Sequence, residues 1–315
     1  MSRRILGTRG SPLALWQARH VAARLEQAHA GLSVELLIIK TEGDRVTDRP
    51  FGEMPGRGFF VKEIEDALLD RTIDLAVHSL KDLPTEQPAG LGIAAVLERH
   101  DPRDAVLSVA GWRFAEVPAG TTVATGSPRR RSQLLNARPD LGMCLVRGNV
   151  DTRIRKLREG QFGAMVLAMA GVERLGITEV PLRPIPIEIC LPAVGQGAVA
   201  VETRADDAGT RGFVESLVHA ETLLCVTAER AFLHRLGGGC LAPTTAHARI
   251  EGSEVVVDAM VGDPDGRRLL RDRSRGQLRD GCRLAEDLAD RLLAAGGDVI
   301  LRDARAVAGG GPPPA

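Results

Sequence analysis

The sequence predicts two α/β lobes followed by a small α+β domain. Apolar runs of strand length alternate with helical periodicity over the first hundred residues, and the same alternation restarts at Asp101. After Ala220 the pattern changes to a long helix, three strands and a further helix. A length of 315 residues, of which 44% are apolar, provides for more than one core. We expect domain 1 at 1–98 and 197–217, domain 2 at 102–192, domain 3 at 220–308, and a disordered tail at 309–315.

The first lobe opens with a predicted β-α-β unit. A strand at Arg4–Gly7 leads to Ser11 and Pro12, which suit the N-cap and the first position of a helix, and a second strand follows at Val34–Ile39. Backbone N–H groups at such a strand-to-helix turn favour anions. Arg9 and Ser11 are therefore candidate anion-binding residues.

The rest of the first lobe is less regular. The segment 41–60 is rich in glycine and proline, and we expect a long mobile loop that could act as a lid. A helix at Val61–Asp70 is followed by a buried strand of a mostly parallel sheet at Ile73–Val77 and another strand at Gly92–Val96. The late strand Gly197–Glu202 implies a chain that crosses twice between two lobes, with a cleft between them.

The remaining elements follow from periodicity and turn signals. In the second lobe we expect strands at Ala105–Val109, Thr121–Thr125, Met143–Val146 and Ala164–Leu167, and helices from Ser127 and at Thr152–Arg158. In the third domain we expect helices at Glu221–Leu236 and Arg283–Ala294, and strands near Thr245–Ile250, Glu254–Val261 and Arg267–Arg273.

The strand Ile73–Val77 ends in an abruptly polar turn that holds His78, Ser79, Lys81 and Asp82. In open α/β sheets, ligands bind beyond the carboxyl ends of strands. A carboxylate and an ammonium group in this turn could therefore perform chemistry. The alternative is a solvated turn in which the two charges merely pair.

Residues 121–160 form a basic patch in the sequence, with nine basic side chains and three acidic ones, although the whole chain has zero net charge. Arginine presents a planar fork that pairs with carboxylates or phosphates. Such a patch suggests a ligand with many anionic groups. Solvated helix starts or a nucleic-acid face are alternatives, but an aromatic content of 3% with no tyrosine argues against base stacking. The candidates are Ser127, Arg129, Arg130, Arg147 and Arg153.

The five cysteines are widely spaced and show no metal-ligand pattern, so we expect reduced thiols and no metal site. Neither an apolar signal region nor a run of about 18 apolar residues is present, which predicts a soluble cytoplasmic protein. Cys240 follows three glycines and could be a nucleophile, an attachment point or a structural residue.

Long segments of the chain resemble the signature segments of the porphobilinogen deaminase (hydroxymethylbilane synthase) family. The resemblance extends over nearly the whole chain. The segments that carry it are Thr8–Trp16, His78–Pro84, Arg147–Val150, Leu191–Gly197, Val226–Arg230 and Gly238–Cys240.

This resemblance implies three domains, the first two similar to type II periplasmic binding proteins, and a transferase of tetrapyrrole biosynthesis. Four porphobilinogen molecules are added to a covalent dipyrromethane cofactor with loss of ammonia, and water releases hydroxymethylbilane. Every pyrrole ring carries an acetate and a propionate, so a series of arginines suits the growing chain. We expect a cytoplasmic monomer that acts on the small molecule porphobilinogen and binds neither nucleic acid nor membrane.

The resemblance also assigns roles to residues. It gives the catalytic role to Asp82 and the thioether to the cofactor to Cys240. Matches to cofactor-binding positions are Ser79, Lys81, Ser127, Arg129, Arg130 and Arg147, and matches to substrate-binding positions are Arg9, Ser11, Arg57, Arg153, Arg174 and Gln196.

The chain departs from the family pattern at four positions. Relatives often carry Ser and Leu where this chain has Gly126 and Pro128, and some carry Lys at Glu53. Leu241 replaces a polar residue beside Cys240. The rival interpretation is a two-lobe protein that binds or senses an anionic solute, but such a protein has no use for the glycine-flanked cysteine.

Overall fold

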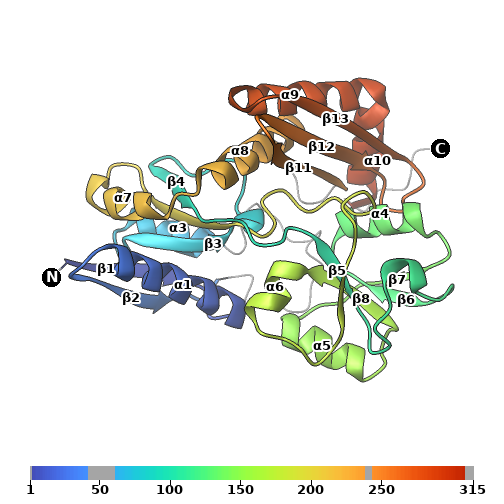
Figure 1. The fold of residues 1–315 in the computed structure, drawn as a ribbon, viewed down its shortest axis with the longest axis horizontal. Coiled ribbons are helices and arrows are strands. Elements are labelled where there is room, and N and C mark those ends of the chain that lie inside the picture. The colour runs from blue at the N-terminus through green and yellow to red at the C-terminus, as the bar shows by residue number, and fades with distance from the viewer. Residues whose placement is uncertain (1, 42–60, 238–242, 309–315) are drawn as a thin grey trace. The chain divides into compact units, whose positions relative to one another are not determined.

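The computed structural model describes residues 2–41, 61–237 and 243–308 (Figure 1). Within these ranges the chain forms two compact units. Unit 1 contains the described residues up to His100 together with 197–223, and unit 2 contains 101–196 and the described residues from Leu224 onwards. The chain therefore passes from unit 1 to unit 2 after His100, returns after Gln196 and leaves unit 1 again after Leu223. The first two of these passages correspond to the two crossings expected between the lobes.

Unit 1 is built on a five-stranded sheet of order β2-β1-β3-β10-β4. The strands are β1 (Ser2–Thr8), β2 (Leu32–Ile38), β3 (Leu75–Ser79), β4 (Leu91–Val96) and β10 (Val199–Arg204). Helices α1 (Pro12–Ala28), α3 (Lys62–Leu69) and α7 (Ala208–Val214) accompany it. Ser11 caps α1 by accepting a hydrogen bond from the N–H of Ala14, as predicted.

Unit 2 repeats this arrangement in a second sheet of order β7-β6-β8-β5-β9. Its elements are β5 (Asp104–Leu107), β6 (Thr122–Ala124), β7 (Gly142–Cys144), β8 (Ala164–Ala168), β9 (Leu182–Pro184), α4 (Pro128–Ala137), α5 (Val150–Arg158) and α6 (Met169–Arg174). In each sheet the fourth strand is the first one formed after the chain crosses, β10 or β5, and it runs antiparallel to both neighbours. The other four described strands of each sheet run in one direction, so β3 lies in a mostly parallel sheet, as expected, with a single opposed strand.

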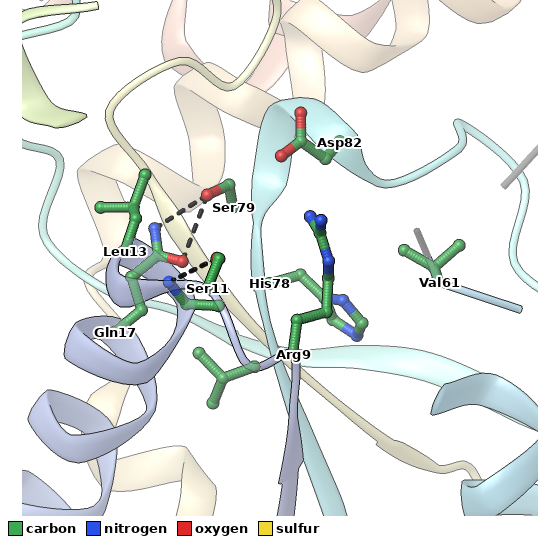
Figure 2. A pocket seen from close by; sticks show the side chains of 10 residues that line it. Arg9, Ser11, Leu13, Gln17, Val61, His78, Ser79 and Asp82 are labelled. Carbon is green, nitrogen blue, oxygen red and sulfur yellow. Dashed lines mark hydrogen bonds between the residues drawn. The ribbon is translucent and has the colours of Figure 1, made fainter. Parts of the chain in front are cut away.

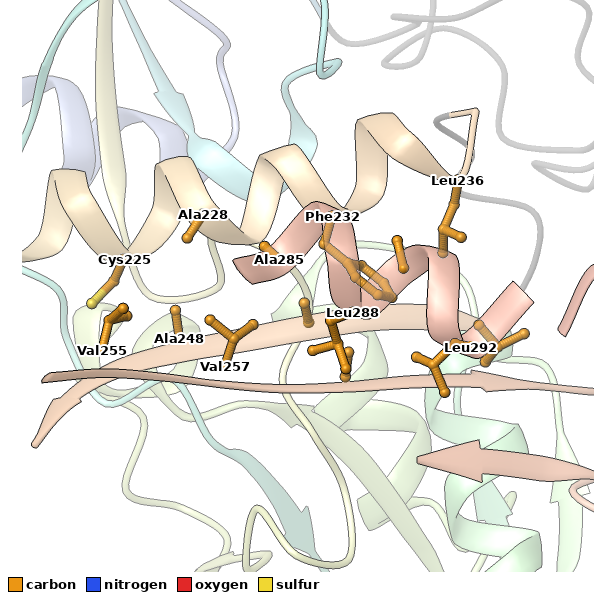
Figure 3. Close-up of a cluster of buried hydrophobic side chains, with 14 of the residues drawn as sticks. Cys225, Ala228, Phe232, Leu236, Ala248, Val255, Val257, Ala285, Leu288 and Leu292 are labelled. Carbon is orange, nitrogen blue, oxygen red and sulfur yellow. The ribbon is translucent and has the colours of Figure 1, made fainter. Parts of the chain in front are cut away.

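The last sheet is antiparallel and lies in unit 2. It consists of β11 (Thr244–Glu251), β12 (Glu254–Gly262) and β13 (Leu269–Gln277), with helices α8 (Ala220–Arg235), α9 (Gly281–Leu292) and α10 (Asp298–Ala308). Phe232 of α8 and Leu288 of α9 are fully buried against Val257 of β12 (Figure 3). The predicted boundary between domains 2 and 3 stays a prediction. Helix α10 was not predicted, because Gly296 (φ 103°) separates it from the helix before it.

The two faces of the sheet in unit 1 are covered differently. Helix α1 packs Ala18 and Val21 against the face that carries Leu75 and Val77. Helix α3 packs Ile64 and Leu68 against the opposite face.

His78 was expected in the polar turn, but it belongs to β3 and is buried, with Nε2 lying 3.1 Å from Glu202 Oε2. The carboxylate that pairs with His78 belongs to Glu202, 124 residues later in the sequence, so the residues around His78 do not indicate that it is buried.

Glu65 of α3 is a second buried carboxyl group near this pair. Burial, and then the negative charge of Glu202, raise the pKa of Glu65 to about 7, while His78 and Lys62 act in the opposite direction. The Oε1 atom of Glu65 is buried and has no hydrogen-bond partner among the described residues. Glu65 therefore retains its proton at a pH where an exposed glutamate would be ionised.

Glu65→Gln tests this assignment. The pKa of Glu65 is higher in the folded protein than its usual value of 4.5, so its contribution to stability is fully present below 4.5 and is lost as the pH rises through about 7. Glutamine stays neutral, so the free energy of unfolding of the variant should fall less than that of wild type between about pH 5 and about pH 8. Urea denaturation across this range measures it. Glu221→Gln, which removes an exposed carboxylate from the later helix that begins at Ala220, is the control, and an identical pH dependence in wild type and Glu65→Gln contradicts the assignment.

Candidate functional site

A pocket of about 70 Å³ lies in unit 1 where β1 and β3 end. These strands run parallel, so the turns that follow them meet at one edge of the sheet. Arg9 and Ser11 come from the turn after β1, and Ser79 and Asp82 come from the end of β3 and the turn after it. Four residues predicted from the sequence are therefore brought together (Figure 2).

The turn after β3 sets how Asp82 is presented. Leu80–Asp82 form a single 3-10 turn, in which Leu80 is buried and Asp82 is exposed. Figure 2 shows Arg9 reaching from the end of β1 towards Asp82. Lys81 is half-buried in the same turn and is not among the described side chains that line the pocket.

Gln17 is a pocket residue that the sequence reasoning missed. Its side chain is buried, and its amide Nε2 donates to Ser79 Oγ at 2.8 Å, while Ser79 Oγ lies 3.2 Å from Gln17 Oε1. The pair fixes the Ser79 hydroxyl at the pocket wall (Figure 2). A signal was present in the sequence, because Gln17 is a polar residue within the helical stripe that continues through Ala18 and Val21.

In unit 2, a fully buried carboxylate binds two of the predicted arginines. Asp104 Oδ2 accepts a hydrogen bond from Arg129 Nη2 at 2.7 Å, and Oδ1 accepts from Arg130 Nε at 3.0 Å and Nη2 at 2.7 Å. Burial alone would raise the pKa of Asp104, but the charges of Arg129 and Arg130 hold it well below its usual range. The group is therefore ionised at every physiological pH.

Other internal groups also bind these arginines and Asp104. Arg129 donates to the carbonyl of Leu191, and Arg130 Nη1 donates to the carbonyl of Val166 at 3.1 Å. Gln196 is 1% exposed, and its Nε2 donates to Asp104 Oδ1 at 2.9 Å. Arg129, Arg130 and Gln196 thus belong to a buried polar network, whereas the resemblance assigned them to ligand binding.

A cluster of repelling cations lies beside this network. Arg153 of α5 is half-buried, and burial followed by the charges of Arg130 and Arg147 lowers the pKa of its guanidinium. Arg174, at the end of α6, is buried, and burial lowers its pKa to about 10. Ser127 caps α4 by accepting from the N–H of Arg130, although Gly126 and Pro128 flank it. Arginines whose charged form is disfavoured by burial, and for Arg153 also by neighbouring cations, suit a ligand with several carboxylates.

Several predicted positions lie outside the described residues, namely Cys240, Arg57, Glu53, Leu241 and the expected loop 42–60. Among the described residues, Cys144, Cys190 and Cys282 form no disulfide. Within the described ranges, no group of acidic, histidine or cysteine side chains has an arrangement that could hold a metal ion. None of the helices there is long and apolar enough to span a membrane.

Comparison with known proteins gives consistent matches along the chain. Residues 5–212 match the family model described as "Porphobilinogen deaminase, dipyromethane cofactor binding domain", and residues 223–294 match "Porphobilinogen deaminase, C-terminal domain". The porphobilinogen deaminase of Trichlorobacter lovleyi is 48% identical over 298 residues, covering 95% of each chain. That of Geobacter sulfurreducens is 46% identical over 303 residues, covering 96% of this chain and 95% of the relative.

Among solved structures, the effector-binding domain of BenM is 13% identical with a TM-score of 0.43, covering 69% of this chain and 90% of that domain. The sequence matches, by contrast, extend from the first lobe to the last sheet. The chain therefore belongs to the porphobilinogen deaminase family, whose members are dipyrromethane-dependent transferases of tetrapyrrole biosynthesis.

Proposed function

We propose that Asp82 is the catalytic residue of this enzyme and that the pocket at the ends of β1 and β3 receives the reacting pyrrole ring. The observation that carries the proposal is the position of Asp82, exposed at the end of a buried strand and beside Arg9, Ser11 and Ser79. An exposed carboxylate beside a cation and two hydroxyl groups can accept hydrogen bonds from ring N–H groups while its neighbours bind ring carboxylates.

The proposed role of Asp82 is electrostatic. Positive charge develops on porphobilinogen as ammonia leaves, and a carboxylate held near the ring nitrogen stabilises that charge. The same carboxylate can assist removal of the proton that is lost when two rings are joined. Gln17 fixes the Ser79 hydroxyl, so that one wall of the pocket is already ordered before the substrate binds.

The cations of unit 2 are proposed to bind carboxylates of the cofactor and of the added rings. Arg153 and Arg174 fit this role because burial disfavours the charged forms of both guanidinium groups. Arg147 fits it because its positive charge acts on Arg153. The Nε atom of Arg129 is also buried without a hydrogen-bond partner among the described residues. The bound dipyrromethane supplies the primer to which porphobilinogen is added. Lys81 and Arg57 are proposed to contribute further positive charge.

We propose Cys240 as the residue that carries the cofactor. Burial raises the pKa of Cys144, and raises that of Cys190 to about 12; partial burial of the thiol and then the charge of Glu286 raise the pKa of Cys282, although the residue as a whole is exposed. A thiol is nucleophilic only as the thiolate, so these cysteines are poor candidates for forming a thioether. We further propose that the protein is a cytoplasmic monomer and binds no nucleic acid. Light scattering after size-exclusion chromatography tests the oligomeric state.

Asp82→Asn keeps the size of the side chain but removes its charge. Single-turnover addition of the first ring by cofactor-loaded enzyme should be slowed by roughly 10²–10³-fold. Asp82→Glu retains the charge but displaces it by one methylene, so this variant should be faster than Asn and slower than wild type. Both should fold, because residue 82 is exposed. Wild-type rates in Asp82→Asn would reduce Asp82 to a turn residue.

Single Arg→Leu changes should separate two classes of arginine. Arg147→Leu and Arg153→Leu should fold and stall at a defined chain length, which the mass of the trapped enzyme reports. Arg129→Leu and Arg130→Leu each remove charged hydrogen-bond donors from the buried Asp104 carboxylate, so both should lower the midpoint of thermal unfolding. Equal destabilisation of all four variants, with no trapped species, argues against the proposed binding role.

Peptide mapping of the purified holo-enzyme tests the attachment site. The peptide that contains Cys240 should be heavier by two linked pyrrole units, and Cys240→Ser should purify at the mass of its own sequence. Cys282→Ser is the matched control, since Cys282 is exposed and should be dispensable. Finding the adduct on any other cysteine rules out the assignment.

A further inference from the structure

We infer that Asp104 is a positioning residue for the reaction, because its buried carboxylate fixes the guanidinium groups of Arg129 and Arg130 and sets the charge that the start of α4 presents to an anionic ligand. The inference rests on the proposed function in one respect, namely that carboxylates of the cofactor or substrate bind beside these arginines. Neither the charge pattern of the sequence nor the family resemblance pointed to Asp104.

The geometry leaves Asp104 little freedom. It is the first residue of β5 and is 0% exposed. Both carboxylate oxygens are used, Oδ2 by Arg129 and Oδ1 by Arg130 and Gln196. Cys190 Sγ is an additional contact, 3.4 Å from Oδ2. Arg130 binds Oδ1 through both Nε and Nη2, and Arg129 is held between Oδ2 and the carbonyl of Leu191, so the carboxylate restricts the orientation of both guanidinium groups.

The charges explain why this position matters. Two guanidinium groups and one carboxylate leave a single net positive charge at the buried start of α4. Arg153 is already destabilised as a cation by Arg130 and Arg147. Without the negative charge of Asp104, Arg129 and Arg130 would add their full charge to that repulsion, and each would be held less firmly, by its backbone carbonyl acceptor.

A chain of hydrogen bonds extends from Asp104 to helix α8. Gln196 binds Asp104, and the N–H of the preceding residue, Gly195, donates to Glu229 Oε2 at 2.7 Å. Glu229 is fully buried on α8, and its Oε1 accepts from the N–H of Ala248 at 2.9 Å. Helix α8 ends at Arg235, shortly before the segment that contains Cys240. The arginine pair is thus tied to the helix that precedes the proposed attachment site.

Asp104→Asn tests the inference in the holo-enzyme. Asparagine keeps the size and one acceptor but removes the charge, so the folded, cofactor-loaded variant should add the first ring at least tenfold more slowly and require more substrate for half-maximal rate. Rates are normalised to the holo fraction measured by intact mass and taken well below the unfolding temperature. Asp101→Asn, a matched change three residues earlier whose carboxylate pairs with Arg103, should retain the wild-type rate.

A second variant separates positioning from folding. Asp104→Asn combined with Arg129→Gln restores one net positive charge, so its unfolding temperature should recover while its rate stays low, because Arg130 is still held less firmly. Recovery of both quantities, or a wild-type rate in Asp104→Asn alone, overturns the inference. If Asp82→Asn and Arg147→Leu are impaired as predicted while Asp104→Asn is not, this inference fails alone. If none of the three is impaired, the proposed function fails with it.

Discussion

The buried contact of Asp104 with Arg129 and Arg130 is the interaction on which the second lobe depends most. Removing charged groups from water is costly, and such a group stabilises a fold only when its geometry is good and its remaining donors and acceptors are bonded. Here the carboxylate is bonded through both oxygens, and the arginines also bind backbone carbonyls. The contact joins the first residue of β5 to the start of α4, and it thereby fixes the helix that opens the basic patch.

The two lobes solve the same topological problem with similar chemistry. In each, the strand formed after the chain crosses is antiparallel and fourth in its sheet, and each of these strands carries a fully buried acid, Asp104 on β5 and Glu202 on β10. Glu202 contacts His78, which also lines the pocket, whereas Asp104 binds the arginine pair. The buried acids of β10 and β5 therefore each contact side chains of a candidate ligand-binding group.

Local features of this fold were predictable from the sequence, and long-range pairs were not. The caps Ser11 and Ser127 and the approximate strand positions follow from neighbouring residues, and the structure confirms them. The burial of His78 depends on Glu202, and the burial of Arg129 on Asp104, partners that no local pattern identifies. Arg129 and Arg130 were expected to contact a ligand. The sequence around a basic residue at the start of a helix is the same whether its partner is a ligand or a buried side chain of the protein, so the sequence could not distinguish the two.

The proposed catalytic role rests on the short exposed turn that holds Asp82 in one unit, and the proposed carboxylate binding rests on a group of arginines in the other. A crystal structure of the holo-enzyme tests the central claim most directly. We predict that an Asp82 carboxylate oxygen lies within about 3.2 Å of pyrrole nitrogens of the bound cofactor. Cofactor rings bound with no hydrogen bond to Asp82 would contradict the account.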